Sequence, residues 1–193
     1  MNAGTERRFD VVAIGASAGG FNALLSIVAE LPAHFAPAML VVLHVPSDRP
    51  CALAALLAGQ CRLPVSEAFD KQPIAPGTIT LAPPDYHMLV EPDRRIALSF
   101  DDPVMFSRPA IDPTFESAAV AYRERMLAVL LTGASRDGSD GAAAVRAHGG
   151  TLWVEDPATA HAPTMPEAAL QRAGADAILP LVQIGPMLGR LTR

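Results

Sequence analysis

The sequence has almost no lysine. Lys71 is the single lysine among 15 basic residues, the formal net charge at pH 7 is −5, and no run of basic residues occurs. Nucleic-acid-binding surfaces need clustered basic residues, so this composition argues against one. No apolar run is long enough to span a bilayer, and residues 1–8 are polar where a signal peptide would be apolar. We therefore expect a cytoplasmic protein that neither binds nucleic acid nor inserts into a membrane.

Cysteine is also scarce. Cys51 and Cys61 flank an apolar helical pattern, and their spacing matches no zinc motif. Two cysteines in a cytoplasmic chain are more often reduced than paired. We therefore expect no metal site, and nothing else in the sequence indicates a cofactor.

Short apolar runs and helical patterns alternate along most of the 193 residues, half of which are hydrophobic. This alternation predicts an α/β fold: a doubly wound, mainly parallel sheet with helices on both faces, and a small antiparallel hairpin. We expect a tail at residues 1–8 and one domain at residues 9–193.

Asp112 is expected to cap a helix whose first position is Pro113. The expected strands are Phe9–Ile14, Ala38–His44, Pro64–Glu67, Thr78–Leu81, His87–Val90, Arg95–Phe100, Met126–Leu131, Thr151–Glu155 and Ala177–Leu179. The expected helices are Gly19–Leu31, Ala52–Gly59, Pro113–Arg125, Ser139–Ala147, Thr164–Arg172 and Val182–Leu191.

Three polar residues follow strands of the predicted sheet. Ser17 lies in the glycine-rich turn after the first strand, His44 ends the second, and Asp137 lies in the loop after the strand that begins at Met126. The carboxyl ends of parallel strands meet at one edge of the sheet. A serine, a histidine and an aspartate there have the types needed for a nucleophile, a general base and an acid that orients the imidazole. The sequence therefore predicts an acyl-transfer site at this edge.

Other interpretations of the same residues stay open. A glycine-rich turn after a strand often binds phosphate, but a dinucleotide site expects an acid where His44 stands, and the turn has no P-loop lysine. Asp140 is a rival for the role of Asp137. The remaining histidines have the pattern of surface or loop residues, of which His87 and His161 could line the site.

An ordered set of short motifs spans roughly residues 9–185. It resembles the catalytic domain of the chemotaxis-type protein-glutamate methylesterases, the CheB family. The matching segments are Gly15-Ala16-Ser17-Ala18-Gly19-Gly20, Leu43-His44-Val45-Pro46, Ala82-Pro83-Pro84-Asp85-Tyr86-His87-Met88-Leu89, Arg108-Pro109-Ala110-Ile111-Asp112, Leu131-Thr132-Gly133 with Asp137-Gly138, and Met165-Pro166.

The resemblance implies that residues 9–193 are a methylesterase-like catalytic domain. Its expected reaction is hydrolysis of glutamyl methyl esters on the cytoplasmic helices of chemoreceptors, with deamidation of receptor glutamines as a second activity. It implies that Ser17 attacks, that His44 is the base and that Asp137 holds the His44 tautomer. A separate regulatory protein is a further expected partner. The residues expected on the oxyanion or substrate side are Ala18, Thr132, Gly133, Ala134, Arg108 and Met165.

The sequence departs from the family pattern at three points. Ala18 stands where the family often has threonine, and Ala134-Ser135 stands where it usually has Met-Gly. Only eight residues precede the first strand, so we expect a catalytic domain without the family's receiver domain. The substitutions at Ala18, Ala134 and Ser135 motivate an alternative, a catalytically degenerate esterase-fold binding module in signalling. The glycine-rich turn alone motivates a third, a nucleotide-binding reductase-like domain.

Arg108 is expected either to contact substrate or to form an ion pair beside a helix. The walls of the expected cleft are Pro83–Met88, Phe106–Asp112 and His161–Met165.

Overall fold

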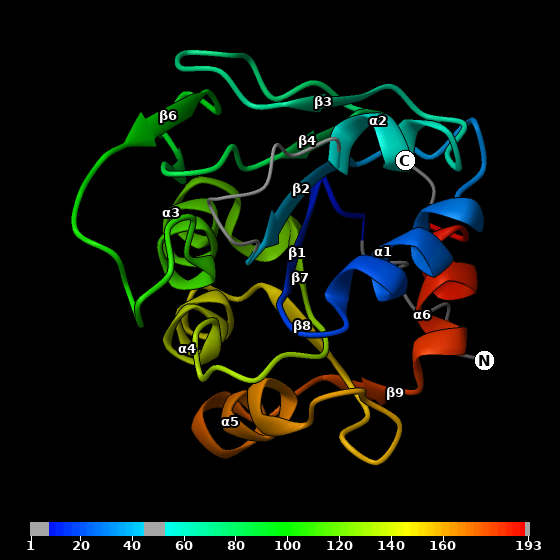
Figure 1. The fold of residues 1–193 in the computed structure, drawn as a ribbon. Coiled ribbons are helices and arrows are strands. Elements are labelled where there is room, and N and C mark those ends of the chain that lie inside the picture. The colour runs from blue at the N-terminus through cyan, green and yellow to red at the C-terminus, as the bar shows by residue number, and fades with distance from the viewer. Residues whose placement is uncertain (1–7, 45–52, 192–193) are drawn as a thin grey trace, which may run out of the picture.

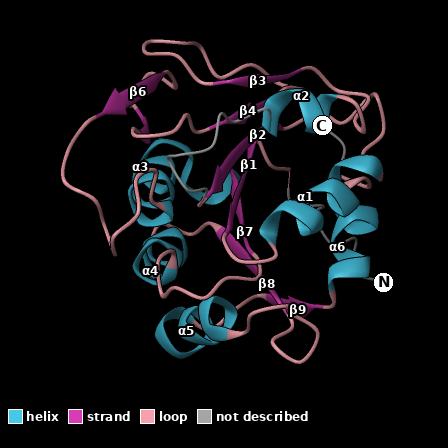
Figure 2. Cartoon of the chain, in the orientation of Figure 1, coloured by secondary structure: helices cyan, strands magenta, loops and turns pink. Residues whose placement is uncertain are grey.

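The computed structural model describes residues 8–44 and 53–191. Seven parallel strands form one sheet with helices on both faces, and two further strands form an antiparallel hairpin (Figures 1 and 2). The strands are β1 (Val11–Ala16), β2 (Ala38–Leu43), β3 (Val65–Glu67), β4 (Ile79–Leu81), β5 (His87–Val90), β6 (Ile96–Ser99), β7 (Met126–Leu130), β8 (Thr151–Glu155) and β9 (Ala177–Leu179). The helices are α1 (Gly20–Ala29), α2 (Leu53–Ala58), α3 (Ile111–Tyr122), α4 (Ser139–Ala147), α5 (Thr164–Ala173) and α6 (Leu181–Leu188).

The order of strands across the sheet is β3-β4-β2-β1-β7-β8-β9, so β1 lies at its centre between β2 and β7. The chain leaves β1 toward α1 on one face and leaves β7 toward α4 on the other face, as Figure 1 shows. Connections that depart to opposite faces open a crevice at the carboxyl ends of the two strands, and ligands of such folds bind there. The expected fold class is confirmed, and Ser17 and His44 follow β1 and β2 at this edge of the sheet.

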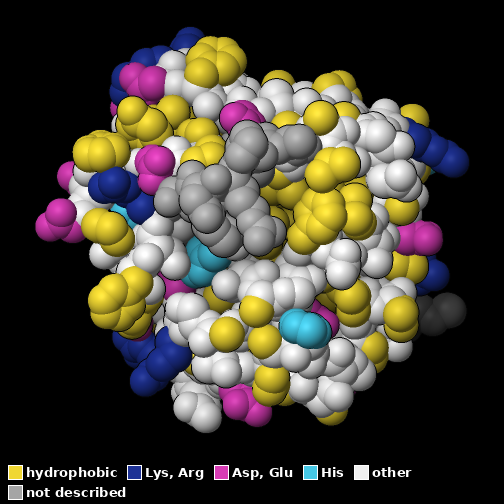
Figure 3. Space-filling view, in the orientation of Figure 1, with side chains coloured by type: hydrophobic (Ala, Val, Ile, Leu, Met, Phe, Trp, Pro, Cys, Tyr) yellow, Lys and Arg dark blue, Asp and Glu magenta, His cyan; other side chains and the backbone are white. Residues whose placement is uncertain are grey.

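Two apolar cores fill the space between the sheet and its helices. All residues of β1, β2, β7 and β8 are buried, as expected for parallel strands covered on both faces. Alternate residues enter different cores: Val12 and Ile14 pack toward α1 and α6, whereas Val11 and Ala13 pack toward α3 and α4. Hydrophobic side chains also reach the surface at several places (Figure 3).

The start of α3 differs from the sequence expectation. The helix begins at Ile111, not at Pro113, and Asp112 is its second residue, not its cap. The carboxylate of Asp137, from the loop after β7, accepts hydrogen bonds from the backbone N–H groups of Ile111 (2.6 Å) and Asp112 (3.0 Å). A distant acid thus satisfies the free donors of the first helical turn, a role that a local cap usually fills. Asp112 itself accepts from the Gly141 N–H of α4 at 2.6 Å.

Among the described residues, no helix is both long and apolar enough to cross a membrane. Cys61 is a free thiol. Three features of the sequence expectation lie outside the described residues: most of the polar tail, Cys51, and the Val45-Pro46 end of the His-x-Pro motif.

Candidate active site

Ser17 lies directly beyond β1, in the turn that leads into α1. Its N–H donates to the carbonyl of Thr132 at 2.9 Å, and its own carbonyl accepts from Gly20 N–H at 2.8 Å. Gly19 has φ 80°, a left-handed conformation that favours glycine, and an added Cβ would lie 2.7 Å from the His161 side chain. Glycine therefore allows the sharp change from strand to helix that leaves Ser17 partly exposed.

His44 follows β2 and lies beside the serine turn. Ala16 and Leu43 are partners in the β1–β2 register, and His44 N–H donates to the Ala16 carbonyl at 3.1 Å. The next pair in this register is Ser17 and His44. Side chains alternate along a strand, so continuing the pattern by one residue puts both on the α3 face of the sheet. The strand pairing thus brings the predicted nucleophile and the predicted base to neighbouring positions.

Asp137 completes a buried acid–imidazole pair. His44 Nε2 and Asp137 Oδ2 are 2.7 Å apart, the His44 side chain is 11% exposed, and the Asp137 side chain is fully buried. Burial alone would raise the pKa of Asp137, but hydrogen bonds from His44 and from the Ile111 and Asp112 N–H groups together lower it. The carboxylate is therefore ionised and only accepts, so His44 Nε2 carries the proton and Nδ1 is the free basic nitrogen.

Among the described residues, the hydroxyl in hydrogen-bond contact with Nδ1 belongs to Ser107, whose Oγ is 3.3 Å from His44 Nδ1. Within the described part of the chain, no hydrogen bond joins the Ser17 hydroxyl to His44. The sequence analysis did not single out Ser107, because a serine in an irregular loop carries no periodic or motif signal. Ser107 therefore contacts the imidazole directly, whereas Ser17 is placed beside His44 by the strand register alone.

Thr132 anchors the serine turn from the neighbouring strand. Its carbonyl accepts from Ser17 N–H, and its hydroxyl donates to the Ala18 carbonyl at 2.8 Å. Its own N–H donates to Glu155 Oε2 at 2.8 Å. Glu155 is 1% exposed, and burial raises the pKa of this carboxyl while the Thr132 bond opposes the rise. Sequence reasoning missed Glu155, although an acid that ends a five-residue apolar strand is an available signal.

The hydrogen bonds around this loop decide which N–H groups remain for an oxyanion. Thr132 N–H is bound to Glu155, and Gly133 N–H donates to the Ala162 carbonyl at 3.0 Å. This corrects the expectation that Thr132 and Gly133 supply oxyanion donors, because both are already used. Within the described residues, nothing accepts from the N–H groups of Ala18 and Ala134, which stay the candidate donors.

The other expected substrate-side residues have structural contacts. Met165 is fully buried, its side chain lies against Gly133, and its N–H donates to the Gly133 carbonyl at 2.9 Å. Arg108 donates to the carbonyls of Phe100 (3.3 Å) and Asp101 (3.1 Å) and lies 3.8 Å from the centre of the Phe100 ring. No acidic side chain pairs with Arg108 among the residues that the structure describes. Arg108 therefore supports the loop between β6 and α3.

His87 and His161 differ in their surroundings. His87 is 2% exposed, which corrects the expectation of a surface or loop position. Its Nδ1 accepts from Ala110 N–H at 3.2 Å, so it helps to hold the start of α3. His161 is exposed and lines a cavity beside the serine turn together with Gly19 and Glu155. His161 is thus the histidine of the two that faces the neighbourhood of the candidate site.

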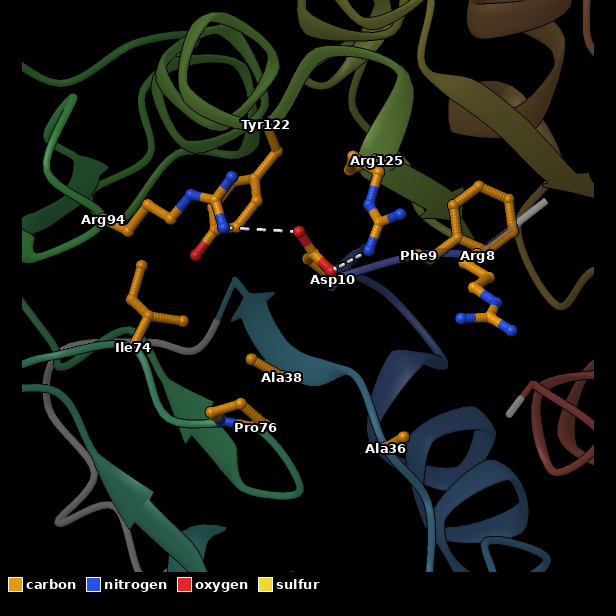
Figure 4. A pocket seen from close by; sticks show the side chains of 10 residues that line it. All are labelled: Arg8, Phe9, Asp10, Ala36, Ala38, Ile74, Pro76, Arg94, Tyr122 and Arg125. Atoms are coloured by element: carbon orange, nitrogen blue, oxygen red, sulfur yellow. Dashed lines mark hydrogen bonds and ion pairs between the residues drawn. The ribbon is translucent and has the colours of Figure 1, made fainter. Parts of the chain in front are cut away.

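A second cavity, of about 330 Å³, lies at the opposite, amino-terminal edge of the sheet (Figure 4). Asp10 is bound there by Arg125 at 2.5 Å and by Arg94 at 3.3 Å. The hydrogen bond from Arg125 lowers the pKa of Asp10 more than burial raises it. Arg94 and Arg125 are thus both paired with Asp10, while the serine, histidine and aspartate lie at the other edge of the sheet.

Comparison with known proteins agrees with this geometry. Residues 12–188 match the model of the family described as CheB methylesterase. The chain belongs to the CheB methylesterase family. The structure superposes on the crystal structure of the Thermotoga maritima CheB methylesterase catalytic domain with a TM-score of 0.89 and 34% identity, covering 95% of this chain and 98% of that one. The predicted esterase class is thereby confirmed.

Two relatives show how the chain relates to longer family members. A protein-glutamate methylesterase/protein-glutamine glutaminase of Caulobacter vibrioides is 39% identical over 188 residues, which cover 95% of this chain and 54% of the relative. A Leptospira interrogans protein whose name carries the same two activities is 36% identical over 183 residues, 95% of each chain. The chain therefore spans about half the length of the first relative and nearly all of the second.

Proposed function

We propose that this CheB-family domain hydrolyses methyl esters of glutamate side chains on the cytoplasmic helices of chemoreceptors, with Ser17, His44 and Asp137 as its catalytic residues. The observation that carries the proposal is the 2.7 Å contact between His44 Nε2 and the buried Asp137 carboxylate, beside the serine turn at the carboxyl edge of the sheet. The names of the relatives, which include both methylesterase and glutaminase activities, support the same substrate class.

The chemistry requires a serine oxygen, a base and donors for an oxyanion. Ser17 Oγ attacks the ester carbonyl while His44 Nδ1 takes its proton, and the tetrahedral intermediate collapses as His44 protonates the departing methanol. Water then attacks the acyl-enzyme, gives its proton to His44 and releases the glutamate, and Ser17 regains its proton. A glutamine would follow the same path with ammonia as the leaving group. The N–H groups of Ala18 and Ala134 are the proposed oxyanion donors.

Ser17 is preferred to Ser107 as the nucleophile because of its place in the fold. Ser17 lies in the turn between β1 and α1, the strand-to-helix position of an acyl-transfer serine at the carboxyl edge of such a sheet, and the Ala18 N–H after it has no acceptor among the described residues. Ser107 lies in the loop between β6 and α3, where it closes a tight turn with Val104. Ser107 Oγ instead supports the orientation of the imidazole from its Nδ1 side.

The test is methanol release from methylated receptor cytoplasmic fragments by wild type, Ser17→Ala and Ser107→Ala. We expect Ser17→Ala to abolish turnover, a loss of at least about a thousandfold in kcat. Ser107→Ala, the matched control, should retain turnover within about tenfold, because it loses one hydrogen bond to the base. The reverse pattern would make Ser107 the nucleophile. An inactive wild type that still binds the fragments would favour the degenerate binding module, motivated by Ala18 and Ala134.

A further inference from the structure

A tight turn projects from the loop between β6 and α3. Val104 and Ser107 exchange two backbone hydrogen bonds, at 3.1 and 2.9 Å, and form an isolated antiparallel bridge. The two residues between them, Met105 and Phe106, have φ values of 47° and 64°. A turn with positive φ at both central positions is usually built from glycine, asparagine or aspartate. Two large apolar side chains in this conformation are unfavourable locally, which points to a role for the side chains themselves.

These side chains are unusually open to solvent. The exposed fraction is 103% for Phe106, 49% for Met105, 64% for Phe100 and 41% for Tyr86. The rings of Tyr86 and Phe100 contact each other with centroids 5.6 Å apart. We call these four side chains the aromatic rim. In Figure 3, hydrophobic side chains stand along the side of the molecule where Figure 1 draws the loop between β6 and α3. Exposed apolar clusters of this kind mark interaction surfaces.

The aromatic rim is continuous with the candidate active site. Ser107 directly follows Phe106, and its hydroxyl is 3.3 Å from Nδ1 of His44. Arg108 follows next, stacks on Phe100 and donates to two carbonyls of the same loop, which holds both ends of the rim together. The rim thus begins one residue from a hydroxyl that contacts the base, so a polypeptide lying across the site can also reach Phe106. A substrate must lie there, whereas any other partner in that position would obstruct the reaction.

We propose that the aromatic rim binds apolar side chains of the helix that carries the scissile glutamyl ester, and so selects a polypeptide substrate over a small ester. This inference rests on the proposed function, because it names the substrate-side surface of the same site. Phe106 is the central contact, since a fully exposed aromatic ring has the most area to bury on binding and aromatic residues often carry a large share of binding energy. The rim acts on substrate binding and takes no part in the chemical step.

The test compares two substrates with one variant. Phe106→Asn removes the ring but keeps a residue that tolerates positive φ, so the turn is retained. With methylated receptor cytoplasmic fragments, we expect kcat/KM to fall about tenfold through KM, as for the loss of one aromatic contact. With the γ-methyl ester of an N-acetylglutamate amide, kcat/KM should stay unchanged. The matched control is Val182→Asn on α6, which removes a side chain that is 79% exposed; both substrates should be unaffected.

Three results would overturn the proposal. Equal kcat/KM of Phe106→Asn and wild type on the receptor fragment would show that the ring contacts no substrate. An equal loss on both substrates would mean that the turn acts through Ser107 on the base. A concentration-dependent dimer of wild type that Phe106→Asn abolishes would make the rim a contact between two copies.

A binding measurement separates this proposal from the proposed function. Fluorescence anisotropy with a labelled receptor fragment measures Kd for Ser17→Ala protein with and without Phe106→Asn. We expect Phe106→Asn to weaken binding about tenfold. If wild type hydrolysed neither substrate but this weakening persisted, the proposed function would fail and the rim would stand as a docking surface. Unchanged Kd would reject the rim whatever the hydrolysis result.

Discussion

Asp112 gives the most discriminating prediction about stability, because its carboxylate is buried close to that of Asp137. Burial is the main cause that raises the pKa of Asp112 from 3.8 to about 7; the Gly141 hydrogen bond opposes the rise, and the neighbouring Asp137 charge adds to it. The fold thus holds two buried carboxyl groups close together. At neutral pH Asp137 is ionised, whereas Asp112 is close to its own pKa and is ionised in only part of the molecules. Asp112→Asn removes this charge, and its amide can still accept from Gly141 N–H and donate to Asp137.

The sign and size of the effect follow from linkage. The pKa of Asp112 is higher in the folded state than its ordinary value of 3.8, so between about pH 4 and pH 7 the folded protein holds a proton that the unfolded chain has lost. Stability therefore falls as pH rises through this window, and the full penalty applies above the folded pKa. A rise from 3.8 to about 7, at about 1.4 kcal/mol for each pH unit, corresponds to about 4 kcal/mol at most.

The assay is chemical denaturation of wild type and Asp112→Asn at pH 4.5 and pH 8. We expect the variant to be the more stable protein at pH 8, by about 1–4 kcal/mol, and to lose most of that advantage at pH 4.5. The control is Asp93→Asn, which loses an exposed ion pair with Arg95 worth at most about 1 kcal/mol. Two results would refute the reasoning. One is an Asp112→Asn variant that is less stable than wild type at pH 8, and the other is a gain in stability over wild type that is the same at pH 8 and pH 4.5.

Two further predictions concern the supports of the serine turn. Glu155→Ala leaves the buried Thr132 N–H without an acceptor, so it should lower the free energy of unfolding by about 1–3 kcal/mol and also lower kcat. Glu155→Gln keeps an acceptor and should preserve stability and kcat. Chemical denaturation measures the first quantity and methanol release the second. Gly15→Ala puts a Cβ 2.5 Å from the Ile111 side chain and should destabilise the fold by about 1–3 kcal/mol, measured as a lower Tm. The control is Gly59→Ala, where the nearest atom to the added Cβ is a carbonyl oxygen at 3.5 Å, and its Tm should not change. An equal change in Tm for both variants would contradict the predicted clash.

Elements set by local signals could be predicted closely from the sequence. The helix at Ser139–Ala147 and the strand at Thr151–Glu155 have the expected bounds, because glycine precedes the helix and the Gly149-Gly150 pair separates it from the strand. The central strands were evident from their continuous apolar runs, which parallel strands buried on both faces require. The alternation of strands and helices predicted the doubly wound fold class, but not the order of the strands across the sheet.

Contacts between distant segments could not be predicted. The start of α3 was misplaced by two residues because its capping acid, Asp137, comes from another loop, and no local signal shows this. Ser107 was missed for a similar reason, whereas Glu155 ends a predicted buried strand and could have been singled out there. Each acts through one hydrogen bond to a residue far away in the sequence, His44 for the first and Thr132 for the second. Single-sequence patterns report burial and local turns but not which polar groups meet.

Asp137 joins the chemistry to the folding of α3. Its Oδ2 accepts from both His44 Nε2 and Ile111 N–H, and its Oδ1 accepts from Asp112 N–H. The lowered pKa of Asp137 contributes stability above its ordinary pKa of 3.8 and loses it as pH falls through the lower folded value. Replacing Asp137 would therefore loosen the helix start and release the imidazole together, so its activity loss cannot be assigned to catalysis alone. His44 makes no hydrogen bond to α3 within the described residues, but its bond to Asp137 helps to lower the pKa of that carboxyl, so the stability of a His44 variant has to be measured beside its activity.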